Sequence, residues 1–205
     1  MAMALFVLRT AALTALLLLA ASARPACARP ARALRRQPEV TIKSITFMGN
    51  GCSFDDTDFI PSQDSVAFRF GGLAVTTDGS LADRRKTCQV SFELDVPDGW
   101  CSAVPKVTGR GFADVEAGSK IIYEFIYYLS GQPGTDSVRR IIKGPAKRIV
   151  EFRQHFSPIV RSQSNGAVNL NVKIVATAEG SKATNIGDSD DDKLRLEFVL
   201  EWKRC

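Results

Sequence analysis

The sequence predicts an all-β protein, an antiparallel β-sandwich of about 7–9 strands that is stabilised by disulfide bonds. Short segments that alternate apolar and polar side chains recur from residue 40 to the end, and Gly- and Pro-containing turns separate them. No part of this region combines the apolar spacing and the capping residues of an amphipathic helix. Four cysteines follow a segment with the features of an export signal, as is typical of a disulfide-bonded secreted domain.

The last thirteen residues, Lys193–Cys205, form the clearest predicted strand. Large apolar side chains recur there at a period of two, and the side chains between them are mostly charged. The apolar set is Leu194, Leu196, Phe198, Leu200 and Trp202. Because a shift of one residue would expose the whole set, the pairing register of this strand should be strongly fixed.

Two strands are expected before residue 80. Val40–Phe47 changes the phase of its apolar side chains between Ile42 and Ile45, which predicts a β-bulge. The polar segment Ser53–Asp64 is expected to be a loop. Val66–Phe70 alternates as a second strand, and the Gly-Gly pair after it ends or kinks that strand.

The middle of the chain is expected to contain a hairpin. Gln89–Val96 alternates cleanly as a strand, and Pro97-Asp98-Gly99 is a turn signal. Trp100–Val107 should return as the partner strand, although Pro105 places it at an edge or limits its length. Thr108-Gly109-Arg110-Gly111 is expected to be a further turn.

The second half of the chain continues the pattern. Ile121–Leu129 is a run of β-branched and aromatic residues, so both of its faces are expected to be covered. Ser137–Ile142 and Arg148–Phe152 are shorter predicted strands. Val168–Ile174 alternates cleanly, and Glu179–Asp192 is expected to be a long acidic loop that leads into the final strand.

Residues 1–28 are expected to be a signal peptide. The apolar run Ala11–Ala21 is too short to span a membrane, and small residues follow it. Cleavage is expected at Ala26-Cys27-Ala28, with Ala21-Ser22-Ala23 as the alternative. We expect a secreted, extracellular protein whose mature chain has no transmembrane segment.

Residues 29–38 are rich in Arg and Pro and are expected to be a linker or a propeptide, whereas residues 39–205 should form a single β-sandwich domain. The formal net charge of the whole chain is +5, but six of its arginines precede residue 37. The rest of the chain has 21 basic and 22 acidic residues. A nucleic-acid partner is therefore not expected, because binding phosphates requires a concentrated basic surface.

Cysteines in the expected domain are Cys52, Cys88, Cys101 and Cys205. Four cysteines in an exported domain most often form two disulfides, and the residues themselves leave all three connectivities open. The chain has no Cys-x-x-Cys pair, so zinc ligation is not expected. We expect neither a metal nor another cofactor.

Several short motifs follow one another in an order that resembles a known family. They are Gly51-Cys52, Cys88, Pro97-Asp98-Gly99, Arg110-Gly111-Phe112, Tyr127-Tyr128-Leu129-Ser130-Gly131, Gly144-Pro145, Ala167-Val168-Asn169-Leu170-Asn171 and Trp202-Lys203-Arg204-Cys205. In order and spacing they resemble domain of unknown function 4360, a family of small exported proteins known mainly from fungi. The resemblance implies a β-rich, disulfide-bonded, secreted domain. It implies no catalytic residue, because no activity is established for the family.

The resemblance also bears on the disulfides. The family has a cysteine in a Ser-Pro-Cys-Gly segment, where this chain has Ser157-Pro158-Ile159-Val160, and this chain has Cys101 in addition. The resemblance therefore implies that a Cys52–Cys88 bond persists and that Cys101 pairs with Cys205.

Catalytic chemistry is not expected. The only histidine, His155, accompanies no Gly-x-Ser-x-Gly motif, which favours a surface or packing role. Glu93 with Asp95, or Glu197 with Glu201, could supply the paired carboxylates of a glycoside hydrolase. The wet face of an amphipathic strand explains the same pattern without catalysis.

Exposed aromatic side chains are the binding surface that the sequence offers. Trp100 follows a tight turn, and Tyr127 and Tyr128 must point to opposite faces of one strand, so these three are the candidate ligand-binding aromatics. We predict a secreted, non-catalytic module at the cell surface or wall, with a cell-wall glycan or an exported protein as its partner. The alternatives are a hydrolase that uses two strand carboxylates and a purely structural wall protein.

Overall fold

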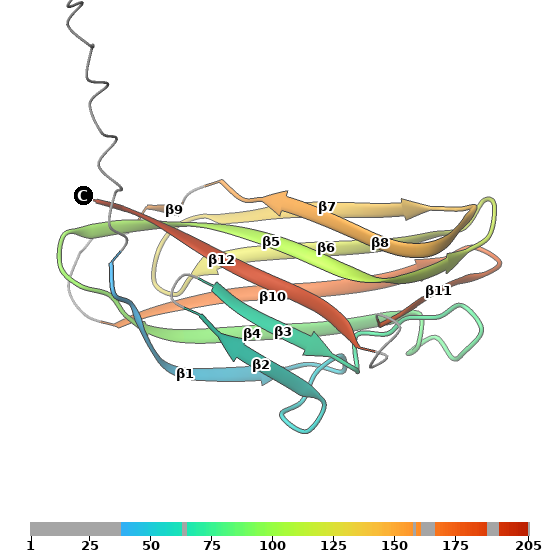
Figure 1. Ribbon diagram of the computed structural model, residues 1–205, viewed down its shortest axis with the longest axis horizontal. Coiled ribbons are helices and arrows are strands. Elements are labelled where there is room, and N and C mark those ends of the chain that lie inside the picture. Colours follow the sequence, from blue (N-terminus) through green and yellow to red (C-terminus); the bar gives the residue numbers. More distant parts are fainter. Residues whose placement is uncertain (1–37, 63–64, 158, 161–166, 188–192, 205) are drawn as a thin grey trace, which may run out of the picture. The chain divides into compact units, whose positions relative to one another are not determined.

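The computed structural model describes residues 38–62, 65–157, 159–160, 167–187 and 193–204. All regular structure in these ranges is β-strand, and the strands form one five-stranded and one seven-stranded sheet (Figure 1). Every strand pair is antiparallel. The predicted all-β sandwich is confirmed. The expected signal peptide and residues 29–37 of the expected linker lie outside the described residues.

The five-stranded sheet has its longest strand at the centre and progressively shorter strands toward both edges. In spatial order its strands are β1 (Thr41–Met48), β4 (Arg85–Asp95), β10 (Ala167–Glu179), β6 (Lys120–Leu129) and β7 (Thr135–Lys143). The register of β1 on β4 shifts between Ile42 and Ser44, so the predicted bulge is confirmed. The bulge brings both Ile42 and Ile45 to partly buried positions against the core.

The seven-stranded sheet is built around one long strand, β5. The strands are β2 (Thr57–Pro61), β3 (Ser65–Phe70), β12 (Leu194–Arg204), β5 (Trp100–Val115), β8 (Ala146–His155), β9 (Ile159–Val160) and β11 (Ala183–Ile186). Strands β12 and β11 pair with successive parts of β5, and β8 pairs with the other edge of β5 across both parts. Thus β11 and β12 lie end to end along one edge of β5, while β8 and β9 lie along the other.

Aromatic rings from both sheets meet in the core. Phe68 of β3 contacts Phe92 of β4 and Phe198 of β12, each with ring centroids 5.8 Å apart. Phe152 of β8 contacts Tyr123 of β6 at 5.5 Å. Burying one large apolar side chain stabilises a fold by roughly 1.5–3 kcal/mol, so these contacts hold the two sheets face to face.

The predicted C-terminal strand is confirmed as β12, which lies between β3 and β5. Its apolar side chains face the core, with Leu200 only partly buried, and its charged side chains face outward. The prediction that both faces of Ile121–Leu129 are covered is met only in part. On the outer face of β6, Ile122 is buried but Tyr128 is half-buried.

The predicted turn at Thr108–Gly111 is wrong, because β5 runs through it without a break. Gly109 faces the core directly opposite Phe152, and a Cβ atom built on it would lie 2.1 Å from Cζ of that ring. The glycine thus makes room for an aromatic ring inside a strand, rather than marking a turn. Pro105 does not lie on an edge strand either; it falls in the gap between the residues that pair with β8 and those that pair with β9.

Two segments predicted as loops contain short strands. β2 lies within Ser53–Asp64, and β11 lies within Glu179–Asp192. Both occupy the margins of the sheet, where backbone pairing alone can define a strand and little apolar pattern is required. The Cys52–Cys88 disulfide is present and joins the turn after β1 to β4. Its predicted companion involves Cys205 and the side chain of Cys101, which lie outside the described part of the structure.

Candidate functional site

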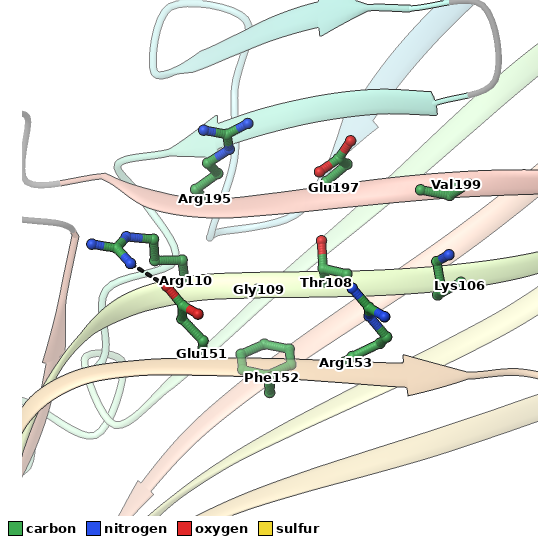
Figure 2. A pocket seen from close by; sticks show the side chains of 10 residues that line it. All are labelled: Lys106, Thr108, Gly109, Arg110, Glu151, Phe152, Arg153, Arg195, Glu197 and Val199. Carbon is green, nitrogen blue, oxygen red and sulfur yellow. Dashed lines mark hydrogen bonds and ion pairs between the residues drawn. The ribbon is translucent and has the colours of Figure 1, made fainter.

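The outward side chains of β8, β5 and β12 enclose a groove of about 590 Å³ on the solvent face of the seven-stranded sheet. Because side chains alternate along a strand, the residues between the core positions of these strands all project to this face. Figure 2 shows them in rows that run across the strands. The outward residues that line it are Lys106, Thr108, Arg110, Glu151, Arg153, Arg195, Glu197 and Val199, and the core-facing pair Gly109 and Phe152 also borders it.

One row at the end of the groove holds three arginines side by side. Arg195 of β12 pairs directly with Arg110 of β5 on one side and with Arg69 of β3 on the other. Glu151 lies beyond Arg110, and Asp58 lies beyond Arg69. Cβ atoms of directly opposite residues are about 4.5–5.5 Å apart, and like charges at that spacing destabilise a sheet.

The two outer arginines of this row have acidic partners. Glu151 forms an ion pair with Arg110 (Figure 2), and Asp58 Oδ2 lies 3.7 Å from Arg69 Nε. Asp58 is shared, because Lys193 Nζ lies 3.1 Å from the same oxygen. Within the described ranges, the exposed Arg195 makes no ion pair or side-chain hydrogen bond. The centre of the row therefore carries an uncompensated positive charge.

The next rows of the groove alternate donors and acceptors. Arg153, Thr108 and Glu197 form one row, and Ser65 Oγ donates a 3.2 Å hydrogen bond to Glu197 Oε1. Lys106 follows at the far end (Figure 2). Guanidinium and ammonium groups donate to hydroxyl and oxyanion oxygens, and carboxylates accept from hydroxyl groups. The groove can therefore hold a polar, hydroxyl-bearing molecule.

Two of the three predicted binding aromatics are buried. Trp100 is 8% exposed, and the Arg204 guanidinium lies 5.0 Å from its ring centroid. Tyr127 is fully buried and packs against Phe156, because its position in β6 faces the core. Burial raises the pKa of the Tyr127 hydroxyl. Neither side chain can form an exposed binding platform, which corrects the prediction for both.

Tyr128 is the one predicted aromatic that faces solvent, on the outer face of the five-stranded sheet. It lies opposite Asn171 of β10, whose Oδ1 accepts a 2.7 Å hydrogen bond from Ser91 Oγ and whose Nδ2 donates to Ser130 Oγ at 2.9 Å. The ring is half-buried among these polar groups. This Tyr128 surface belongs to the other sheet, so it does not contribute to the groove.

The carboxylates singled out in the sequence are occupied by neighbouring side chains. Glu93 accepts a 3.1 Å hydrogen bond from Ser44, and Asp95 lies 3.3 Å from Lys43 Nζ. Glu197 and Glu201 share the outer face of β12, as predicted, but four residues of strand separate their Cα atoms by about 13 Å.

Two further candidates are the single histidine and a possible metal cluster. His155 is exposed at the end of β8, opposite Lys106. Among the residues that the structure describes, no three His, Cys, Asp or Glu side chains are close enough to hold a metal ion together. None of the described segments is a helix of the length and apolarity needed to span a membrane.

The groove is the feature that the sequence did not reveal. The alternation in Lys193–Cys205 correctly put Arg195 and Glu197 on the polar side of a strand. It could not show that Arg110, predicted to lie in a turn, would pair directly with Arg195. A continuous strand through Gly109 was the missing step, because it alone extends the polar side of β5 across the face.

Comparisons with known proteins agree with the sequence analysis. Residues 38–205 match the family model described as Domain of unknown function (DUF4360). A protein of Arthroderma benhamiae described as an uncharacterized secreted protein is 27% identical over 177 residues, which are 82% of this chain and 72% of that protein. This relative confirms the predicted secretion.

One solved structure, TmCBM61 in complex with beta-1,4-galactotriose, covers 79% of this chain and 90% of its own. Its TM-score is 0.30 and its sequence identity is 14%, a similarity too distant to support a statement about this chain.

Proposed function

This chain belongs to the DUF4360 family, and we propose that it is a secreted, non-catalytic module that binds a cell-surface or cell-wall glycan in the groove on its seven-stranded sheet. The groove carries the proposal. Hydrogen-bond donor and acceptor side chains from three adjacent strands line this groove of about 590 Å³. Glycans present many hydroxyl groups that both donate and accept, and this lining is complementary to them.

The scaffold beneath the groove favours binding. Arg110, Thr108 and Lys106 project from β5, which is paired on both edges by β12 and β8. Side chains on a paired strand lose less freedom on binding than side chains on a loop, so more of the contact energy remains as affinity.

The arrangement of the groove carboxylates supports a non-catalytic role. Glu151 and Glu197 lie on β8 and β12, with β5 between them and one row of offset. From strand spacing and rise, their Cα atoms are about 12 Å apart. Glu151 is paired with Arg110, and Glu197 accepts a hydrogen bond from Ser65.

A panel of wall and extracellular polysaccharides, immobilised and probed with the secreted protein, tests this function. Thr108 lies at the centre of the groove, so Thr108→Tyr should fill it and weaken binding by roughly tenfold or more. Thr46→Tyr is the matched control, because Thr46 is exposed on β1 of the other sheet. Tyr suits strands as well as Thr does, so neither change should prevent folding.

A blank panel would contradict the proposal, and so would equal effects of the two substitutions. Release of soluble sugars from a bound polymer would instead favour the hydrolase. Capture of a protein but no glycan would favour an exported protein as the partner, and absence of all binding would leave a structural wall protein.

A further inference from the structure

We infer that the groove selects an anionic glycan, one whose sugar units carry carboxylate or sulfate groups, and that Arg195 makes the central contact. This inference rests on the proposed function, because it names the class of glycan bound at the same groove. It starts from the row of three arginines, in which Arg195 stands between Arg110 and Arg69.

The position of Arg195 is unfavourable without a ligand. It meets an arginine across each edge of β12, and directly opposed like charges destabilise a sheet. Within the described residues it gains no ion pair in return. An oxyanion bound over Arg195 would convert two repulsive neighbours into three donors for one ligand group. The guanidinium fork suits this purpose, because it donates two parallel hydrogen bonds to a carboxylate or a sulfate.

One acidic side chain lies beside each outer arginine of the row. The Arg110–Glu151 pair is solvent-exposed, with side-chain exposures of 41% and 66%. Exposed pairs of this kind contribute little stability, so exchanging the Glu151 contact of Arg110 for a contact with a ligand costs little. Asp58 is shared between Arg69 and Lys193.

Charge at the opposite end of the groove indicates a polymer rather than a single small anion. Lys106 lies four residues from Arg110 along β5, a separation of about 13 Å between Cα atoms. Its Nζ lies 3.9 Å from Glu201 Oε1, a distance that leaves its three donors incompletely engaged. Thr108 and Glu197 lie between the two ends and can contact sugar hydroxyl groups. The groove thus has cationic side chains at both ends and hydroxyl-binding side chains between them. A glycan chain with anionic groups at intervals is complementary to this arrangement.

Matched polymers that differ only in charge provide the test. Polygalacturonate is compared with its fully methyl-esterified form, and dextran sulfate with dextran; the first pair tests carboxylate and the second sulfate. Binding to the secreted protein is measured at low and at raised salt. A charged polymer should bind roughly tenfold or more tightly than its neutral form, and raised salt should weaken its binding.

Three variants assign the effect to the groove. Arg195→Gln should weaken binding of the charged polymer by roughly tenfold or more. Glu151→Gln should strengthen it, because that change removes a negative charge from the groove. Arg85→Gln removes the same charge as Arg195→Gln from an exposed position on the other sheet and should change nothing. Arg195→Gln should leave the melting temperature unchanged or raise it, which separates lost binding from lost folding.

The outcomes separate this inference from the proposed function. Equal binding of charged and neutral polymers, still weakened by Thr108→Tyr, would overturn the anionic selectivity and leave the glycan-binding groove intact. Binding of no polymer would remove both. Equal losses from Arg85→Gln and Arg195→Gln would indicate simple ion exchange and overturn the inference, as would equally tight binding of a DNA duplex.

Discussion

Two tyrosines of β6, Tyr123 and Tyr127, share a buried face but differ in what their hydroxyl groups contact. The Tyr123 hydroxyl accepts a 2.6 Å hydrogen bond from Asn185 Nδ2. Asn185 also accepts a 2.6 Å bond from the backbone N–H of Val75, so it fastens the loop before β4 to β11. Within the described structure, the Tyr127 hydroxyl is buried without a hydrogen-bond partner. The two tyrosines are therefore equally buried, but their hydroxyl groups contribute differently to stability.

Replacing each tyrosine by Phe should show this difference. Tyr123→Phe should lower the free energy of unfolding by about 1–3 kcal/mol, because it leaves the buried Asn185 amide without its acceptor. Tyr127→Phe should be close to neutral or stabilising, because it removes an unsatisfied polar atom. Urea unfolding of the two variants measures both values. Equal losses would contradict the assigned contacts.

The same two hydroxyl groups predict a loss of stability at alkaline pH. Burial raises the pKa of both above the usual value of 10.0, and the Asn185 hydrogen bond opposes this only partly for Tyr123. Above pH 10.0 the unfolded chain releases these protons while the folded chain retains them, so unfolding becomes more favourable. The tyrosine contribution is therefore complete below that pH and declines as pH rises toward the folded-state values.

Urea midpoints measured between neutral pH and the region above pH 10.0 test this sign. Tyr127→Phe should make the alkaline decline less steep, because one of the two groups is gone. A decline that is identical in the variant and the parent protein would show that Tyr127 does not contribute.

At the scale of single elements, β5 depends on a glycine inside the strand. The ring of Phe152 lies directly against Gly109, and the same ring packs on Tyr123 and Phe125 of the opposite sheet. The strand continues only because position 109 has no side chain. The groove depends on this continuity, since Thr108 and Arg110 flank the glycine on the outer face.

Gly109→Ala should therefore destabilise the protein by about 1–3 kcal/mol through overpacking. Phe152→Leu is the matched second change, because it shortens the side chain that the new Cβ would meet. The double variant should lose less stability than the sum of the two single losses, as expected for residues in direct contact. Strict additivity in denaturant unfolding would mean that the two positions do not touch.

At the scale of the whole molecule, the sequence predicted the sandwich but not the assembly of its surface. Alternation in Lys193–Cys205 and Gln89–Val96 identified β12 and β4, since one face of each strand is buried. Alternation did not identify β2 and β11, because short strands at the margins of a sheet need little apolar alternation. It failed again at Gly109, because a glycine that admits a ring and a glycine that makes a turn look alike in sequence.

The site was harder to predict than the fold for a physical reason. Alternation states which side of its strand Arg195 occupies, but not which strands become neighbours or in what register. The Arg110–Arg195–Arg69 row exists only through the pairing of β5, β12 and β3. For the aromatics, alternation correctly implied that Tyr127 and Tyr128 diverge, yet only the packed core shows that Tyr127 is the buried one.

Backbone NMR of the secreted protein, titrated with a glycan that it binds, tests the central claim most directly. If the groove is the binding site, the largest amide shifts should fall on its three strands, around Thr108, Phe152 and Glu197. Shifts gathered around Tyr128 and Asn171 would place the glycan on the other sheet and contradict the claim.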